Sequence, residues 1–376
     1  MNAESIDNAV PARPDGERLG LSVVMLTLLA MGIGLVLVYS ITASRPLVDE
    51  TGANLRHPFL MQAGYVVVSL TAILVVARIP YPKLARFAPW ILIAALLMLL
   101  ALRLPGFARE IKGATRWFRF GPVGVQPSEF AKVALVLFFA WFLSRGVDPL
   151  RSFLRGFVPA GATLALIVAL VAMQPDFGTS LFLAATGGFL MLLAGARVLH
   201  FGPAVLAAGV PFAGYMVSRF DHIRSRIEGF RDPLAHYNTE HSLLALGTGG
   251  WFGRGLGNGR EKLDYLPESS SDFIFSILGE ELGFVGAGLL ALLYVAFLWQ
   301  GARIAMRSED TLGFYLAAGA TFLVALQALI HIAVATASVP TKGIPLPFVS
   351  VGGSNLLSLS IGVGMLASVA RGRRGT

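Results

Sequence analysis

The stretch FIFSILGEELGFVGAGLLALLYVAFLWQG, residues 273–301, is an almost unbroken apolar run. A bilayer hydrocarbon core about 30 Å thick needs about 20 apolar residues per helix, so this run is long enough to cross it. The whole chain has the same character, with 55% hydrophobic and 14% charged residues, against about 45–50% apolar and about 25% charged residues in soluble domains. We therefore expect an integral membrane protein.

Similar runs divide almost the whole chain into about ten predicted transmembrane helices. They cover residues 19–42, 57–77, 87–104, 128–144, 157–173, 178–195, 201–217, 273–301, 312–335 and 350–370. Runs this continuous indicate helices, because a helix satisfies its own backbone hydrogen bonds in lipid. The expected fold class is all-α, with an N-terminal tail (1–18), one ten-helix domain (19–370) holding a large extracytoplasmic loop at about 218–272, and a C-terminal tail (371–376).

Ten helices put both termini on one side of the membrane, and the basic residues indicate which side. The first run is too long for a signal-peptide core, so we expect it to be retained. The short loops on the side of the termini carry many arginines, which makes that side cytoplasmic. The opposite loops are also basic. Arginines there would suit an anionic, phosphate-bearing ligand, although anionic lipid head groups or drift without function are alternatives.

Several polar side chains fall inside the apolar runs, where an unpaired charge costs about 2.5–3.5 kcal/mol. Glu129 and Lys132 are three residues apart on one helical face, so we expect either an ion pair or a substrate contact. Gln327 and His331 are expected to hydrogen-bond to a neighbouring helix. Asp176, in QPDFGTS, suits helix capping or catalysis.

Other kinds of chemistry find little support. The chain has no cysteine, which excludes thiolate nucleophiles and thiolate metal sites. It has no Gly-x-Ser-x-Gly motif and no histidine-based triad. The glycine-rich stretch GTGGWFGRGLGNGREK, residues 247–262, lacks the preceding strand and the Lys-Ser/Thr ending of a nucleotide loop, so a tightly turned segment is favoured over a phosphate cradle. No nucleic-acid partner is expected.

Four segments together resemble the SEDS family of bacterial shape, elongation, division and sporulation proteins. They are GATRWFRFGPVGVQPSEFAK (113–132), QPDFGTS (174–180), SLLALGTGGWFGRGLGNGREKLDYLPESSSDFIFSILGEELGFVGAG (242–288) and PTKGIPLPFVSVGGSN (340–355). The PTKG and GEELG forms look more like the FtsW branch than the RodA branch. The resemblance implies a glycosyltransferase that polymerises lipid II at the outer face of the bacterial cytoplasmic membrane. It also implies a class B penicillin-binding protein as partner, together with other divisome or elongasome membrane proteins.

The resemblance carries over to particular residues. The aspartate of the family's LPE…DFIF segment is essential, and it matches Asp272. The lysine of QPSEFAK matches Lys132, and the Arg-Trp pair matches Arg116 and Trp117. The departures from the usual pattern are Ser269, Ser270 and Ser271 for Ala-His-Thr, His241 for Gln, His331 for Asn and Val351 for Tyr. They leave the aspartate intact and bear on substrate fit and branch.

The implied reaction needs one carboxylate and several cations. A polyprenyl pyrophosphate leaves without protonation, so Asp272 as general base for the acceptor hydroxyl suffices, and positive charge stabilises the departing group. The candidate substrate-binding residues are Arg116, Trp117, Glu129, Lys132, Arg224, Arg226, Asn258, Glu268, Lys342 and Ser350. A magnesium or manganese ion, with Asp272 as a candidate ligand, is a further source of charge; no other cofactor is expected.

The sequence leaves alternatives open. Asp272 also suits the N-cap of the eighth run. The protein would be a lipid II transporter if Glu280 and Glu281, about 12 Å deeper at roughly 1.5 Å per residue, lined a polar path. It would be a non-catalytic scaffold if it only recruited the transpeptidase. A role in division, elongation or sporulation is equally compatible with these residues.

Overall fold

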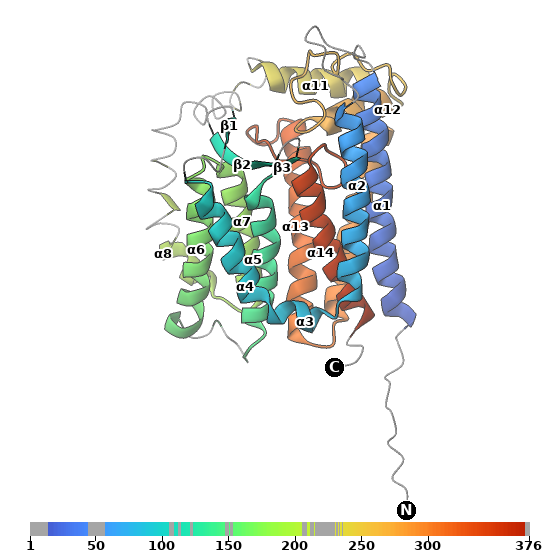
Figure 1. Ribbon diagram of the computed structural model, residues 1–376. Coiled ribbons are helices and arrows are strands. Elements are labelled where there is room, and N and C mark those ends of the chain that lie inside the picture. The colour runs from blue at the N-terminus through green and yellow to red at the C-terminus, as the bar shows by residue number, and fades with distance from the viewer. Residues whose placement is uncertain are drawn as a thin grey trace, which may run out of the picture.

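The chain forms a bundle of roughly parallel helices, with a small sheet and one further helix at one end (Figure 1). The structure, a computed structural model, describes residues 14–43, 57–104, 109–111, 114–120, 123–146, 150, 153–204, 236–372 and single positions between 209 and 234. Helix α1 (Pro14–Ala43) begins and α14 (Gly353–Arg371) ends at the same end of the bundle, while α11 (Tyr237–Gly249) lies across the other end.

Among the described residues, five helices are long and apolar enough to cross a membrane. They are α1, α2 (His57–Arg78), α12 (Ile274–Met306), α13 (Thr311–Ala335) and α14. Beside them run the shorter helices α4 (Ala88–Ala101), α5 (Pro127–Leu143), α6 (Val158–Ala172) and α7 (Phe177–Leu193). Every predicted run except 201–217 coincides with one of these helices, so the all-α membrane class is confirmed.

The remaining helical elements are short. Helix α3 (Tyr81–Arg86) connects α2 to α4, and a π-helical turn at Phe153–Phe157 precedes α6. Of the predicted run 201–217, the structure describes chiefly the end of α8 (Val198–Ala204), so that prediction lies largely outside the described residues. The same is true of the first part of the large loop predicted at about 218–272, which is described continuously only from residue 236.

Helix starts follow ordinary capping chemistry. Helix α5 has Pro127 in its first turn, where the missing N–H is no loss. The carboxylate of Asp176 accepts a hydrogen bond from the backbone N–H of Thr179 (3.3 Å) and so caps α7, which confirms the capping expectation. Asp310 caps α13 in the same way through the N–H of Gly313 (2.7 Å).

The connection from α4 to α5 contains a three-stranded antiparallel sheet that the all-α expectation missed. Its strands are β1 (Arg109–Ile111), β2 (Ala114–Phe120) and β3 (Val123–Val125), in the order β1-β2-β3. Phe118 of β2 pairs with Val125 and is buried, while Ser354 of α14 donates to the carbonyl of Gly124 (3.2 Å). The sheet therefore packs on the bundle. Strands this short give a weak periodic signal beside long apolar helices.

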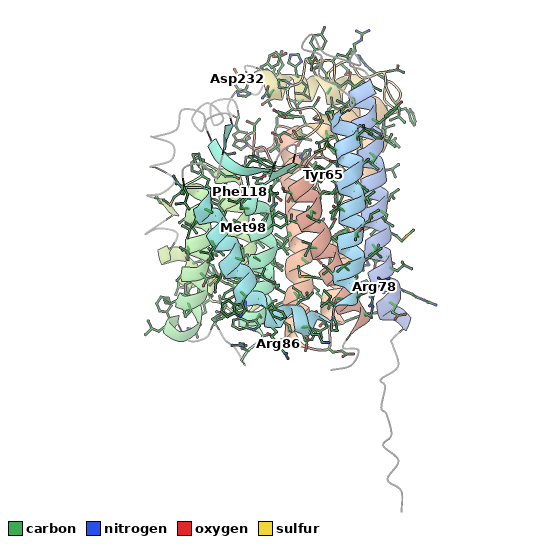
Figure 2. All side chains as sticks on the ribbon, in the orientation of Figure 1. Tyr65, Arg78, Arg86, Met98, Phe118 and Asp232 are labelled. Atoms are coloured by element: carbon green, nitrogen blue, oxygen red, sulfur yellow. The ribbon has the colours of Figure 1, made fainter. Side chains whose placement is uncertain are left out.

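Charged residues mark the two ends of the bundle. Arg78 and Arg86 lie at the end where α1 begins, and Asp232 lies near the opposite end (Figure 2). This arrangement agrees with the expected grouping of the short basic loops on the side of the termini. The membrane side that each end faces stays a prediction.

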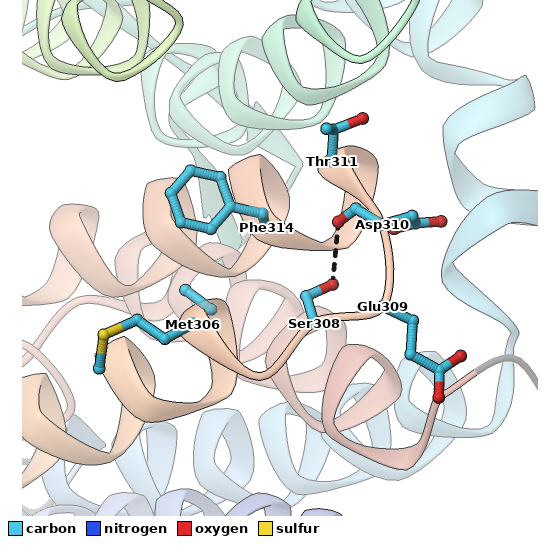
Figure 3. Close-up of a pocket in the computed structure, with 7 residues that line it drawn as sticks. Met306, Ser308, Glu309, Asp310, Thr311 and Phe314 are labelled. Carbon is cyan, nitrogen blue, oxygen red and sulfur yellow. Dashed lines mark hydrogen bonds between the residues drawn. The ribbon is translucent and has the colours of Figure 1, made fainter.

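An open pocket of about 490 Å³ lies at the turn between α12 and α13 (Figure 3). Its lining residues are Ala305, Met306, Ser308, Glu309, Asp310, Thr311 and Phe314. The hydroxyl of Ser308 donates to the backbone carbonyl of Asp310 across the turn (3.1 Å). Because this turn follows the last residue of α12 and Asp272 precedes the first, the pocket lies at the far end of the helix from Asp272.

Candidate functional site

Asp272 lies half-buried in the turn that leads into α12. Its backbone N–H donates to the carbonyl of Glu268 (3.0 Å), which also accepts from Ser271 N (3.1 Å). Glu268 itself has a left-handed backbone (φ 54°) and is exposed. Phe273 holds the N-cap position of α12, so Asp272 does not occupy the position that the capping alternative required.

The connection between α13 and α14, residues 340–352, packs directly against this turn. Gly343 faces the carboxylate, since a Cβ on Gly343 would lie 2.9 Å from Asp272 Oδ2. The hydroxyl of Ser350 donates to the carbonyl of Ser271 (2.6 Å). The N–H of Val351 donates to the carbonyl of Ser270 (3.0 Å). These contacts hold the predicted residues Asp272 and Ser350 in one structural unit.

Helix α13 holds the same connection from the other side. His331 Nδ1 hydrogen-bonds to the carbonyl of Ile344 (2.8 Å), and the Gln327 amide donates to the carbonyl of Pro345 (2.7 Å). The expected hydrogen bond to a neighbouring helix is confirmed for Gln327, which accepts from Lys132 of α5 (3.0 Å), and is wrong for His331, which bonds the connection instead. Their acceptors are carbonyls of the connection that follows α13, although Gln327 also contacts a second helix.

That second contact belongs to a buried ion pair inside the bundle. Lys132 Nζ lies 2.7 Å from Glu129 Oε2 and donates to Gln327 Oε1 (3.0 Å). Asn355 of α14 donates to the same Glu129 oxygen (2.7 Å). Both charged residues are almost fully buried, so each charge is compensated by a partner and by further hydrogen bonds. The ion-pair reading of these two residues is confirmed, and their role as substrate ligands stays a prediction.

A small, partly open cavity lies between this ion pair and Gly343, the residue that faces Asp272. Its volume is about 30 Å³, room for roughly one or two water molecules. The lining residues are Gln126, Glu129, Lys132, Thr179, Phe182, Gly343, Ile344 and Pro345. Gly343 thus borders both the cavity and the Asp272 carboxylate.

Arg116 and Trp117 lie on β2 near the start of α7. The guanidinium of Arg116 donates to the carbonyls of Gln174 (3.1 Å) and Pro175, just before the Asp176 cap. Trp117 packs on the sheet, because a Cβ on Gly124 would lie 3.2 Å from its ring.

Lys342 joins this region to the 340–352 connection. A Cβ on Gly178, in the first turn of α7, would lie 3.9 Å from Lys342 Cβ. The half-buried Lys342 stands next in sequence to Gly343, which contacts Asp272. Arg116 contacts the residues just before α7, and Lys342 approaches the first turn of α7, so both cationic residues lie beside the start of that helix.

Three further predicted ligands are Asn258, Arg224 and Arg226. The amide of Asn258 is exposed and donates to the carbonyl of Arg254 within its own loop (3.2 Å). Arg224 and Arg226 lie outside the described residues. These predictions therefore gain no geometric support.

Glu280 and Glu281, on which the transporter alternative rests, bind the glycine-rich loop. The carboxylate of Glu280 accepts the backbone N–H groups of Arg260 (2.7 Å) and Glu261 (3.2 Å). Glu281 pairs with Lys262 at 2.5 Å, and both side chains are buried. These carboxylates hold the glycine-rich loop in place, and Lys262 at the end of that loop is a buried structural partner.

Comparisons with known proteins agree with this architecture. Residues 21–375 match the family model for FtsW, RodA and SpoVE, described as "Cell cycle protein". The chain is 36% identical over 359 residues to the probable peptidoglycan glycosyltransferase FtsW of Trichlorobacter lovleyi, covering 93% of each chain. It is also 36% identical to the stage V sporulation protein E of Bacillus subtilis, over 93% of this chain and 96% of that one.

A solved structure has the same fold. The matching chain comes from work described as "Structural coordination of polymerization and crosslinking by a peptidoglycan synthase complex". It superposes with a TM-score of 0.75 at 25% sequence identity, covering 93% of this chain and 97% of the other.

Proposed function

The chain belongs to the FtsW, RodA and SpoVE family of cell cycle proteins, and from that membership we propose that it is a peptidoglycan glycosyltransferase. Its substrate in this proposal is lipid II, which it polymerises into glycan strands at the outer face of the bacterial cytoplasmic membrane during division or shape maintenance. The names of its relatives support the activity. The observation that carries the assignment to a residue is the carboxylate of Asp272, half-buried beside the Gly343 backbone.

In the proposed step, Asp272 acts as a general base. The oxygen of an acceptor sugar hydroxyl bonds to the anomeric carbon of the donor, and its proton passes to the Asp272 carboxylate. The bond from that carbon to the polyprenyl pyrophosphate breaks, and the electron pair leaves with the phosphate oxygen. A general base positioned in this way contributes about 10²- to 10⁴-fold to a rate.

Cations beside Asp272 would stabilise the departing pyrophosphate. Lys342 stands next in sequence to Gly343, which contacts Asp272, and Arg116 lies beside the start of α7. Trp117, Glu129, Lys132, Glu268 and Ser350 complete the proposed binding set within the described residues. A pyrophosphate at head-group depth requires such a site where a loop meets a membrane helix, which is the position of Asp272 in the sequence and fold.

A magnesium or manganese ion is compatible with one carboxylate. Magnesium is commonly held by one or two carboxylates together with substrate phosphates. The described part of the chain holds no group of three histidine, aspartate or glutamate side chains that would bind an ion without substrate. Asp272 would therefore share the ion with the pyrophosphate, and the ion would add positive charge there.

We also propose a class B penicillin-binding protein as partner. The similar solved chain belongs to a peptidoglycan synthase complex in which polymerization and crosslinking are coordinated. Other divisome or elongasome membrane proteins would join this assembly. A transporter is less well supported, because Glu280 and Glu281 are buried in contacts with the glycine-rich loop.

The test uses purified full-length protein, lipid II and a divalent cation, with and without the partner, and measures glycan chains by gel electrophoresis. We expect chains from the parent and at least about a 100-fold loss in Asp272→Asn and Asp272→Ala. Asp264→Asn, an exposed carboxylate on the same loop, is the matched control and should keep activity. Full activity of Asp272→Asn would remove the base assignment. Lipid movement without chains would support the transporter instead.

A further inference from the structure

Helix α12 is broken inside its predicted membrane-spanning length. Gly283 has φ 70° and ψ −169°, far from helical values, so the residues before and after it cannot exchange their normal hydrogen bonds. The glycine-rich loop supplies the missing partners. Arg254 N and Gly255 N donate to the carbonyls of Glu280 and Glu281 (3.0 Å each).

The same loop also provides acceptors for the backbone N–H groups that follow Gly283. Phe284 N donates to the carbonyl of Gly250 (2.8 Å), and Val285 N donates to the carbonyl of Trp251 (3.1 Å). Glycines make this approach possible: a Cβ on Gly253 would run into the carbonyl of Glu281, and one on Gly283 would run into the backbone of the loop. Residues 250–262, here called the clasp, therefore form a single unit with the broken helix.

Side chains tie the end of the clasp to the same helix. Lys262 Nζ donates to Glu281 Oε1 (2.5 Å) and to the hydroxyl oxygen of Ser40 on α1 (2.8 Å). Ser40 Oγ in turn lies 2.8 Å from Glu281 Oε1. All three residues are buried, and Lys262 is among the largest fully buried side chains of the described chain. In a low-dielectric interior these three side chains keep their geometry, because losing one partner would leave a buried charge uncompensated.

Asp272 lies between Lys262 and Glu281 in the sequence. Asp272 stands ten residues after Lys262 and nine before Glu281, so the ion pair closes a ring of chain that contains it. The half-helix 274–282 connects Asp272 to Glu281 rigidly, and Ser40 fixes the ring to α1. The position of Asp272 relative to the bundle therefore depends on contacts that do not touch it.

We propose that Lys262, Glu281 and Ser40 are positioning residues for Asp272. They set where its carboxylate stands relative to the 340–352 connection, and they do not contact substrate. This inference rests on the proposed function for its kinetic readout only. Its structural readout stands without any activity.

The kinetic test compares Glu281→Gln, Lys262→Met and Ser40→Ala with the parent in the polymerisation assay. We expect kcat to fall about 10- to 100-fold while KM for lipid II changes less than about threefold, because a misplaced base slows the reaction without removing binding contacts. Ser368→Ala is the control. It removes another buried membrane-helix hydroxyl, one that donates to the carbonyl of Ile79, and should leave kcat unchanged.

The structural test uses the absence of native cysteine. Ser270→Cys and Val351→Cys introduce thiols at two residues joined by a backbone hydrogen bond, and oxidation in membranes reports their alignment. We expect ready crosslinking in the otherwise unchanged chain and clearly slower crosslinking with Ser40→Ala or Glu281→Gln added. Unchanged crosslinking in both would overturn the inference, as would equal kinetic effects of Ser40→Ala and Ser368→Ala. An inactive parent would overturn only the proposed function.

Discussion

Gly343 and Asp272 are in close contact: a Cβ on Gly343 would lie 2.9 Å from Asp272 Oδ2. A side chain there must push the carboxylate away or displace the 340–352 connection. That connection is itself held by Gln327 and His331 through the carbonyls of Pro345 and Ile344, so it has little freedom to move. We therefore expect the Asp272 carboxylate, and not the 340–352 connection, to move.

Gly343→Ala is accordingly expected to lower kcat about 10- to 100-fold, since small displacements of a reacting group are costly. Polymerisation kinetics on purified protein measure the effect. Gly362→Ala is a matched control, because a Cβ there would meet only Ala320 Cβ at 4.0 Å. Equal activity of the two variants would show that the contact is unimportant.

Breaking the Glu129–Lys132 pair should destabilise the bundle. Removing one partner of a buried pair costs about 3–5 kcal/mol, because the other charge is left uncompensated. Glu129→Gln and Lys132→Met should each lower the midpoint of thermal unfolding in detergent, and the double variant should lose less than the sum. Glu309→Gln, an exposed carboxylate, should stay within about 0.5 kcal/mol of the parent. Single variants as stable as the parent would contradict the prediction.

The two capped helices offer a paired test of Asp176. Asp176→Ala and Asp310→Ala each remove an N-cap and should cost about 0.5–2 kcal/mol of stability, while the Asn variants should retain most of it. Only Asp176 stands beside the Arg116 contacts, so only Asp176→Ala should also reduce polymerisation. Similar activity losses in both alanine variants would point to general destabilisation instead.

Lys342→Gln tests the proposed pyrophosphate contact. We expect KM for lipid II to rise more than kcat falls, and the difference from the parent to shrink at high salt, because screening weakens the charge interaction. Lys83→Gln changes a lysine of α3, at the other end of the bundle, and should leave KM unchanged. A salt-independent effect would argue against a charge contact.

The sequence predicts the helices well because apolar runs of membrane length have few alternatives in lipid. The SEDS resemblance of four motifs is confirmed by a family match over residues 21–375. Spacing also offers the Glu129–Lys132 ion pair and the Asp176 cap, each beside one alternative, and the structure confirms both. These features all depend on residues close together in the chain.

Contacts between distant residues were beyond that reasoning. The fit of Gly253 against Glu281 and of Gly343 against Asp272 depends on backbone approach, for which a lone glycine is an ambiguous signal. The sequence shows Lys262 only as a basic residue of a loop. Its hydrogen bond to Ser40, more than two hundred residues earlier, appears only in the structure. The short β2 strand was hidden for a simpler reason, because strand alternation over seven residues is weak evidence beside helices.

The break at Gly283 also bears on biogenesis. Residues 250–262 are synthesised before α12, yet their hydrogen-bonding partners belong to that helix. Until the loop and the helix meet, the carbonyls of Glu280 and Glu281 and the N–H groups of Phe284 and Val285 lack these partners. Docking of residues 250–262 on α12 is thus a late event in folding. A chimaera of two related proteins should fold properly only if residues 250–262 and α12 come from the same protein.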